Sequence, residues 1–136
     1  MATRQHQLRL VLEAPARVRH GEPVLLIFTI TNPGPESVTL QLLGRAPSAD
    51  FRVSDARGRI VWSHLRGKTM LGALRLFPLD AGKHLVFRHA WDQHGDDGAP
   101  VPPGEYLARG VLLTDDPAGL VSAPARFRID RGRTGG

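Results

Sequence analysis

The sequence predicts an all-β protein, an antiparallel immunoglobulin-like β-sandwich of about seven to nine strands. Apolar residues recur at every second position through most of the chain, which is the period of a half-buried strand. Proline and glycine interrupt this pattern at spacings of roughly 8–15 residues, and no window keeps a helical period over three turns. Pro103-Gly104 precedes Tyr106 at the start of the next-to-last expected strand. In such sandwiches a tyrosine at this corner bonds to the backbone a few residues upstream.

The first half of the chain contains five expected strands. Residues 24–31 are apolar on both faces, which favours a central strand. Residues 32–35, with two prolines and a glycine, end this strand because they favour turns. The expected inward positions are Leu8, Leu10 and Leu12; Val24, Leu26, Phe28 and Ile30; Val38, Leu40 and Leu42; Phe51 and Val53; and Ile60, Trp62 and His64.

The second half continues the alternation after one ambiguous segment. Between residues 66 and 77, Met70, Leu71, Leu74 and Phe77 would share a helical face, whereas Leu74 and Leu76 also alternate as in a strand. Two glycines weaken a helix there. The expected inward positions beyond it are Leu85, Phe87, His89 and Trp91; Tyr106, Ala108, Gly110 and Leu112; and Val121, Ala123, Ala125, Phe127 and Ile129.

Length and composition predict one soluble domain. The 136 residues are expected to form a domain over 1–129, followed by a flexible basic tail over 130–136. There is no cysteine, which excludes disulfides and thiolate metal sites and suits a reducing cytoplasm. No run approaches the roughly 18 apolar residues of a membrane helix, and Arg9 interrupts the one candidate for an apolar leader. We therefore expect a cytoplasmic protein without a membrane partner.

The net charge of +5 comes almost wholly from arginine. Most arginines alternate singly with apolar residues, which places them on the solvated faces of strands. A nucleic-acid partner is not expected, because a basic groove with exposed aromatic side chains is missing from the pattern.

The order of these features resembles the BsuPI-type intracellular proteinase inhibitors, over about residues 8 to 129. Two positions depart from the family pattern: Met70 stands where an aromatic residue is usual, and residues 81–83 replace Pro-Gly-Glu. The resemblance implies an immunoglobulin-like sandwich that inhibits an intracellular subtilisin-like serine protease, and it assigns no reactive-site residue. The similar segments are 28–32, 51–55, 58–62, 68–70, 79–83, Trp91 and 101–106.

No pattern in the chain predicts an enzyme or a cofactor. The serines lie outside any Gly-x-Ser-x-Gly context. Asp92, Asp96 and Asp97 fall in a glycine-rich loop where nothing would desolvate them. This loop also departs from a calcium-binding loop, so a hairpin connection is the favoured interpretation. His84 and His89 point to opposite strand faces and cannot share a metal, and His89 is expected to be a hydrogen-bonded core residue.

Three loops are candidates for binding a protease. Residues 64–73 offer Leu65, Arg66, Met70 and Leu71, although the last two fit a core equally well. Residues 93–103 are polar and rich in proline, with His94 as their large side chain, and residues 45–50 are short. A plain solvated connection also explains either of these two. The expected supporting residues are Trp62, Trp91, Pro103, Gly104 and Tyr106.

The alternative to inhibition is an adaptor or regulatory domain that binds another protein through an edge strand or a loop.

Overall fold

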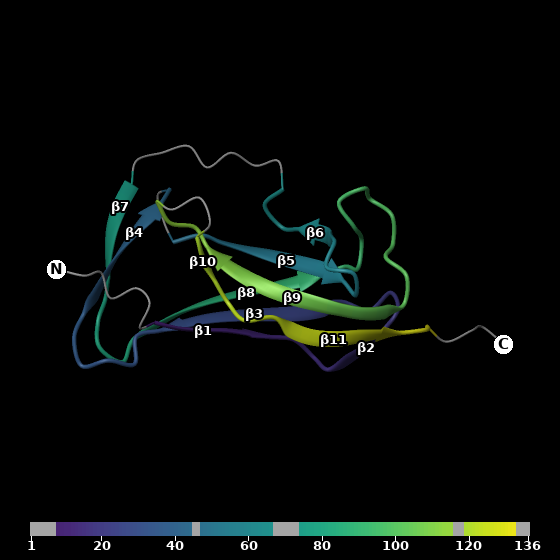
Figure 1. Cartoon of the computed structure of the whole chain (residues 1–136), viewed down its shortest axis with the longest axis horizontal. Helices are drawn as coiled ribbons and strands as arrows, with labels where there is room; N and C mark the ends of the chain where they lie inside the picture. Colours follow the sequence, from purple (N-terminus) through teal and green to yellow (C-terminus); the bar gives the residue numbers. More distant parts are fainter. Residues whose placement is uncertain (1–7, 45–46, 67–73, 116–118, 133–136) are drawn as a thin grey trace.

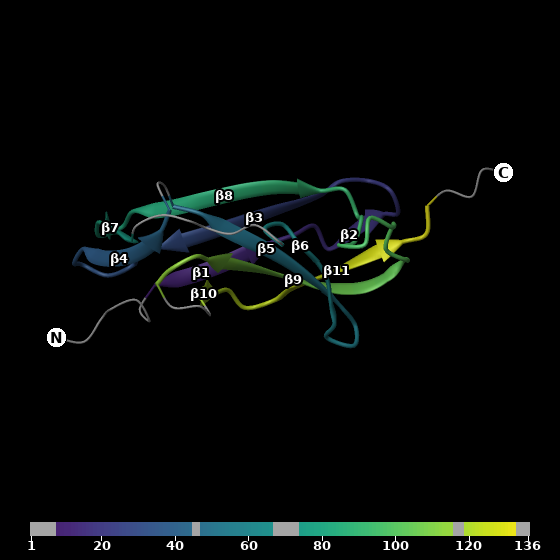
Figure 2. The same cartoon turned by 90° about the horizontal axis from the view of Figure 1, so that it is seen from above.

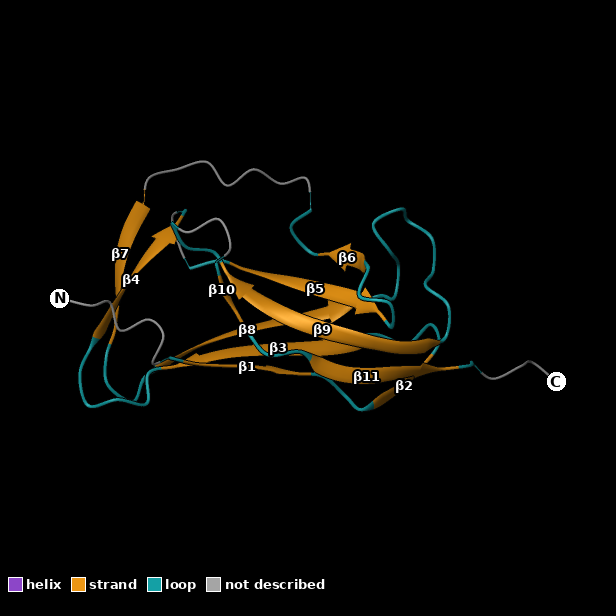
Figure 3. Cartoon of the chain, viewed as in Figure 1, coloured by secondary structure: helices purple, strands orange, loops and turns teal. Residues whose placement is uncertain are grey.

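The computed structural model describes residues 8–44, 47–66, 74–115 and 119–132. These residues form strands and loops only, which confirms the predicted all-β class (Figure 3). No helix that could cross a membrane occurs in the described part of the chain. The strands are β1 Arg9–Glu13, β2 Arg17–Arg19, β3 Val24–Thr31, β4 Val38–Leu43, β5 Ala49–Asp55, β6 Ile60–Ser63, β7 Leu74–Leu79, β8 His84–Trp91, β9 Gly104–Leu112, β10 Leu120–Val121 and β11 Ala125–Asp130.

Two sheets form the layers of the sandwich. The three-stranded sheet has the order β1-β3-β8, and the six-stranded sheet has the order β2-β11-β9-β5-β6, with β10 also paired to β9. Figure 1 shows β9 and β11 in front of β3 and β8, and the view from above in Figure 2 separates the two layers. A two-stranded ribbon of β4 and β7 lies at one end.

One strand pair departs from a purely antiparallel arrangement. After β1 the chain crosses to the other sheet, where β2 pairs in parallel with β11. The backbone N–H of Arg128 donates to the carbonyl of Ala16 (2.9 Å), and that of His20 donates to the carbonyl of Asp130 (2.8 Å). This pairing continues β11 to Asp130, one residue beyond the predicted end of the domain.

The core lies between the inner faces of the two sheets. Val24, Leu26, Phe28 and Ile30 of β3 are fully buried, as the alternation predicted for a central strand. The Phe28 ring packs directly against the backbone of Gly110 on β9 of the opposite sheet. A Cβ atom at Gly110 would lie 2.3 Å from this ring.

The predicted inward face from residue 121 to residue 129 is wrong in its first half. Val121 is 45% exposed, and the neighbouring Ser122 is buried instead. The hydroxyl of Ser122 accepts from the N–H of Gly110 (3.0 Å) and donates to the carbonyl of Ala123 (2.9 Å). These polar bonds turn the chain between β10 and β11, so the alternation restarts at Ala125, and Phe127 and Ile129 are buried as predicted.

The ambiguous segment is a strand where it is described. Leu74 and Leu76 are 51% and 70% exposed on β7, and Phe77 and Leu79 face inward. The helical alternative is therefore wrong for residues 74–77, and Met70 and Leu71 lie outside the described residues.

We expect Gly110→Ala to lower the free energy of unfolding by about 1–3 kcal/mol, because the added methyl group overpacks the Phe28 ring. Urea unfolding measures the change. Gly34→Ala is the control, because its Cβ would meet only the Asn32 side chain at 3.5 Å. Equal losses in the two variants would contradict the steric explanation.

Candidate protein-interaction site along the β6 edge

Two of the three predicted loops meet along the outer edge of β6, the end strand of the six-stranded sheet. Asp96, in the loop of residues 92–103 between β8 and β9, joins them. Its N–H donates to the carbonyl of Val61 (2.9 Å), and its Oδ1 accepts from the N–H of Ser63 (3.1 Å). Its Oδ2 lies 3.8 Å from Nε of Arg66. We call this region, residues 64–66 together with 92–103, the β6-edge site.

A buried glutamine anchors the loop of residues 92–103. Gln93 has a φ of 65° and is 1% exposed. Its amide N–H₂ donates to the carbonyls of Arg19 (2.8 Å) and Glu22 (2.6 Å), and its Oε1 accepts from the N–H of Gly21 (3.0 Å). These bonds offset the cost of a left-handed backbone in a residue other than glycine. The sequence does not predict this role, because a glutamine in a polar loop gives no sign of burial.

The tip of the same loop is exposed but held by hydrogen bonds. Nε1 of Trp91 donates to the carbonyl of His94 (2.9 Å), and the N–H of Gly95 donates to the carbonyl of Ala99 (2.8 Å). The His94 side chain is 48% exposed. These hydrogen bonds within the chain define the shape of the loop.

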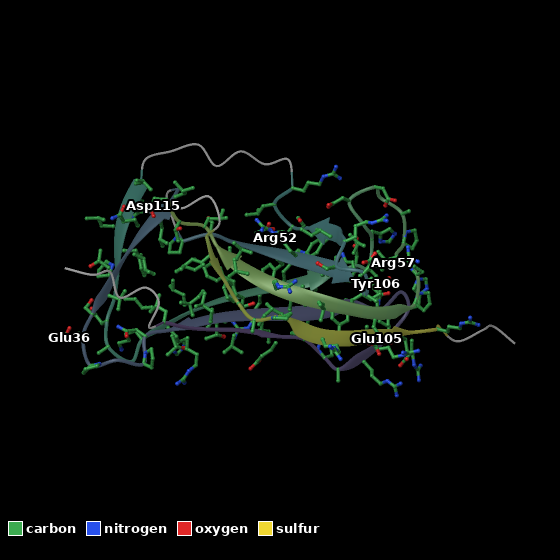
Figure 4. All side chains as sticks on the ribbon, viewed as in Figure 1. Glu36, Arg52, Arg57, Glu105, Tyr106 and Asp115 are labelled. Carbon is green, nitrogen blue, oxygen red and sulfur yellow. The ribbon has the colours of Figure 1, made fainter. Side chains whose placement is uncertain are left out.

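The loop ends at a tyrosine corner. Tyr106 is buried, and its hydroxyl donates to the carbonyl of Pro102 (2.5 Å), four residues upstream. Between them, Pro103 is exposed and Gly104 has a φ of 151°, which favours glycine. Figure 4 places Tyr106 and Arg57 near one end of the molecule and Glu36 and Asp115 near the other.

The turn of residues 64–66 is anchored by a buried carboxylate. Asp50 is 4% exposed; one oxygen accepts from the N–H of Leu65 (2.9 Å) and the other from Nε of Arg52 (2.9 Å). The third predicted loop therefore also contributes, through its last residue. Leu65 is half-buried and the Arg66 side chain is 63% exposed, while residues 45–46 and 67–73 lie outside the described part.

A cluster of aromatic and histidine rings lies next to the β6-edge site, between β6 of one sheet and β8 of the other. Trp62 stacks on Trp91 and His89, with centroids 5.4 Å and 5.5 Å apart, and the His64 and His89 rings are 4.1 Å apart. His89 belongs to β8 and His64 follows β6, so the cluster links the two sheets. Burial is the main cause that lowers the pKa of His89, and the charge of His64 lowers it further. The charge of Asp92 acts in the opposite direction and raises this pKa.

The expectation of a hydrogen-bonded core histidine is wrong for His89. Its ring is half-buried, and in the described part of the chain it makes ring contacts and no hydrogen bond. The sequence places His84 on the same strand as His89, whereas the histidine ring that contacts His89 is His64 from the other sheet.

An open groove of about 560 Å³ lies between β6 and the loop, and its lining includes Ile60 of β6, Pro100 of the loop and Arg66 of the 64–66 turn. Its carboxylates have structural partners: Asp96 binds the β6 backbone, and Asp97 accepts from the N–H of Ala99 (2.9 Å). Among the described residues, no three His, Asp or Glu side chains are placed to hold a metal ion. The groove therefore offers a partner its shape and its charged side chains, and no metal-binding cluster of described residues.

These features define a β-sandwich domain that displays preorganised loops. A family model described as BsuPI, intracellular proteinase inhibitor, matches residues 12–117. The chain therefore belongs to the BsuPI family of intracellular proteinase inhibitors.

Other comparisons show the fold alone. The chain is similar to part of the alkylpurine DNA glycosylase AlkC of Pseudomonas fluorescens, solved with DNA containing an abasic site analog. The identity is 18% and the TM-score 0.53, over 91% of this chain and 30% of the glycosylase. It is also similar to part of the β-glucosidase EmGH1 of Erythrobacter marinus, with 15% identity and a TM-score of 0.50 over 90% of this chain and 15% of that one. A comparison with curated proteins finds no match.

We expect acidification to destabilise the fold through His89. Because its pKa in the folded state is below the usual 6.5, the unfolded chain takes up a proton first as the pH falls through 6.5. The free energy of unfolding should therefore fall below this pH. Chemical unfolding at a series of pH values should show a shallower fall for His89→Phe, and an unchanged one for His84→Asn on the exposed face of β8. An unchanged slope in His89→Phe would refute this origin.

We expect Gln93→Ala to lower the free energy of unfolding by about 2 kcal/mol, because three backbone groups lose their partner. Urea unfolding checks this value. The control, His94→Ala, removes an exposed ring from the same loop and should change stability by less than about 0.5 kcal/mol. A Gln93→Ala variant as stable as the parent would show that the loop does not depend on this anchor.

Proposed function

We propose that this protein inhibits an intracellular subtilisin-like serine protease by placing the β6-edge site in the protease cleft. The observation that carries the proposal is membership of the BsuPI family, whose model spans both loops of the site. The subtilisin-like class of the target comes from the family resemblance.

Preorganisation supports this site as the contact surface. A substrate-like inhibitor loop must keep its shape in the cleft. The peptide bond of a cleaved or acylated loop then re-forms faster than the new chain ends leave the protease. Gln93 fixes the base of the longer loop, and Asp50 fixes the start of the shorter one. A loop ordered before binding loses less entropy on association, which allows tight binding from an interface of ordinary size.

The two loops have different roles in the proposal. The loop of residues 92–103 supplies a rigid polar surface that includes His94, and Arg66 adds an exposed positive charge next to it. Leu65, Met70 and Leu71 in the neighbouring segment supply the apolar side chains that suit a primary specificity pocket. Of these three, only Leu65 lies within the described residues.

The direct test is a titration of an active-site-titrated intracellular subtilisin-like protease with the purified chain. We expect residual activity to fall to near zero at equimolar inhibitor, and intact-mass spectrometry to find at most one cut, within residues 64–73 or 92–103. A metalloprotease serves as the control for class. Unchanged turnover with slow cleavage at many positions would reject inhibition and support the adaptor alternative.

Charge reversal maps the contact surface. We expect Arg66→Glu to raise the inhibition constant at least about tenfold, because it places a negative charge beside Asp96 in the proposed interface. Arg9→Glu makes the same charge change on the outer face of the three-stranded sheet, on β1, and it should leave the constant unchanged (Figure 1). If the two variants have the same inhibition constant, the protease contact lies elsewhere on the chain, and the proposal of inhibition itself is unaffected.

A further inference from the structure

The outer face of the six-stranded sheet concentrates arginines. In the part of the chain that the structure describes, the outer face of the three-stranded sheet carries two, Arg9 and Arg88. The arginines of the sequence are therefore unevenly distributed once the chain is folded. This sheet lies in front in Figures 1 and 4, and Figure 4 labels Arg52 and Glu105 on it. Its six arginines are Arg17, Arg19, Arg52, Arg109, Arg126 and Arg128.

The strand register places like charges opposite one another on this face. Arg52 lies opposite Arg109 between β5 and β9, and Arg17 lies opposite Arg128 between β11 and β2. Like charges in directly opposite positions destabilise a sheet. Asp130 lies beside both arginines of the second pair, whereas an anionic partner would explain the first pair, Arg52 and Arg109.

Three carboxylates on the face neutralise only part of this charge. Asp130 lies 3.6 Å from Nε of Arg17 and 3.2 Å from Nε of Arg128. Glu105 lies 3.6 Å from Arg128, and Asp50 bonds to Arg52. Arg109 and Arg126 make no ion pair with any described carboxylate. The face thus keeps an excess of three positive charges.

Arg126 stands between two hollows of this surface. The larger, about 350 Å³, is lined by Arg17, Arg126 and Arg128 together with Glu105. The smaller, about 150 Å³, is lined by Arg126, Leu107 and neighbouring residues of β9 and the β5–β6 turn. Guanidinium groups in this arrangement can bind carboxylates with two hydrogen bonds each.

We propose that this face, centred on Arg109 and Arg126, binds an acidic segment of a protein partner. A polypeptide fits better than a nucleic acid for two reasons. The two aromatic rings on the adjoining strands, Tyr106 and Phe127, are 3% and 1% exposed, so neither ring offers a stacking surface for bases. Glu105 and Asp130 also interrupt the positive face, which opposes a continuous chain of phosphates. This binding surface is centred on different residues from the β6-edge site, although Asp50 contacts both, and binding to it does not depend on inhibition.

The test measures binding of a fluorescein-labelled peptide of alternating glutamate and glycine by anisotropy at low salt. The double variant Arg109→Gln/Arg126→Gln should weaken binding at least about tenfold, which corresponds to about 1.4 kcal/mol. The control, Arg9→Gln/Arg88→Gln, removes the same charge from the other sheet and should change binding by less than about twofold. The unfolding midpoint of each variant verifies its fold. If the double variant unfolds, Arg126→Gln alone replaces it, because that side chain is exposed.

Three outcomes would overturn the proposal. Equal weakening in both double variants would mean that net charge alone attracts the peptide. No measurable binding by the parent chain would reject the surface. Tighter binding of a single-stranded DNA oligonucleotide of the same charge would assign the face to nucleic acid.

Discussion

The contact between the Phe28 ring and the backbone of Gly110 sets how closely the two sheets approach. A sandwich core is filled by side chains from both inner faces, and a missing side chain on one face must be matched by a large one on the other. Here β3 supplies the ring and β9 supplies the gap. The edges β6 and β8 then come close enough for Trp62, His64 and His89 to stack between the sheets.

The conformation of the loops of the β6-edge site depends on how the strands pair in the two sheets. Gln93 reaches the backbone of residues 19–22 only because β8 and the start of β3 are held side by side in one sheet. Asp50 reaches the N–H of Leu65 because β5 and β6 are neighbours in the other sheet. Polar side chains at strand ends thus fix exposed loop residues in position relative to the core.

The hydrophobic period predicted most of the strands and their inward faces. The inward positions of β3, β4, β5 and β9 follow from it, because alternate side chains must reach the same core. The period gave no sign of β2, whose three residues carry two exposed arginines. It also misplaced Val121, because the hydroxyl of Ser122 bonds to the β9 backbone and outweighs the alternation. The roles of Gln93, Asp50 and His64 depend on partners distant in sequence, which no local pattern reveals.

The β6 edge has a further meaning because Asp96 occupies backbone groups that an end strand otherwise offers to other molecules. Unpaired strand edges promote association with further chains. The loop therefore covers the part of this edge that could pair with a further chain. A cut near Asp96 would expose these backbone groups of β6, and the edge could then pair with another strand.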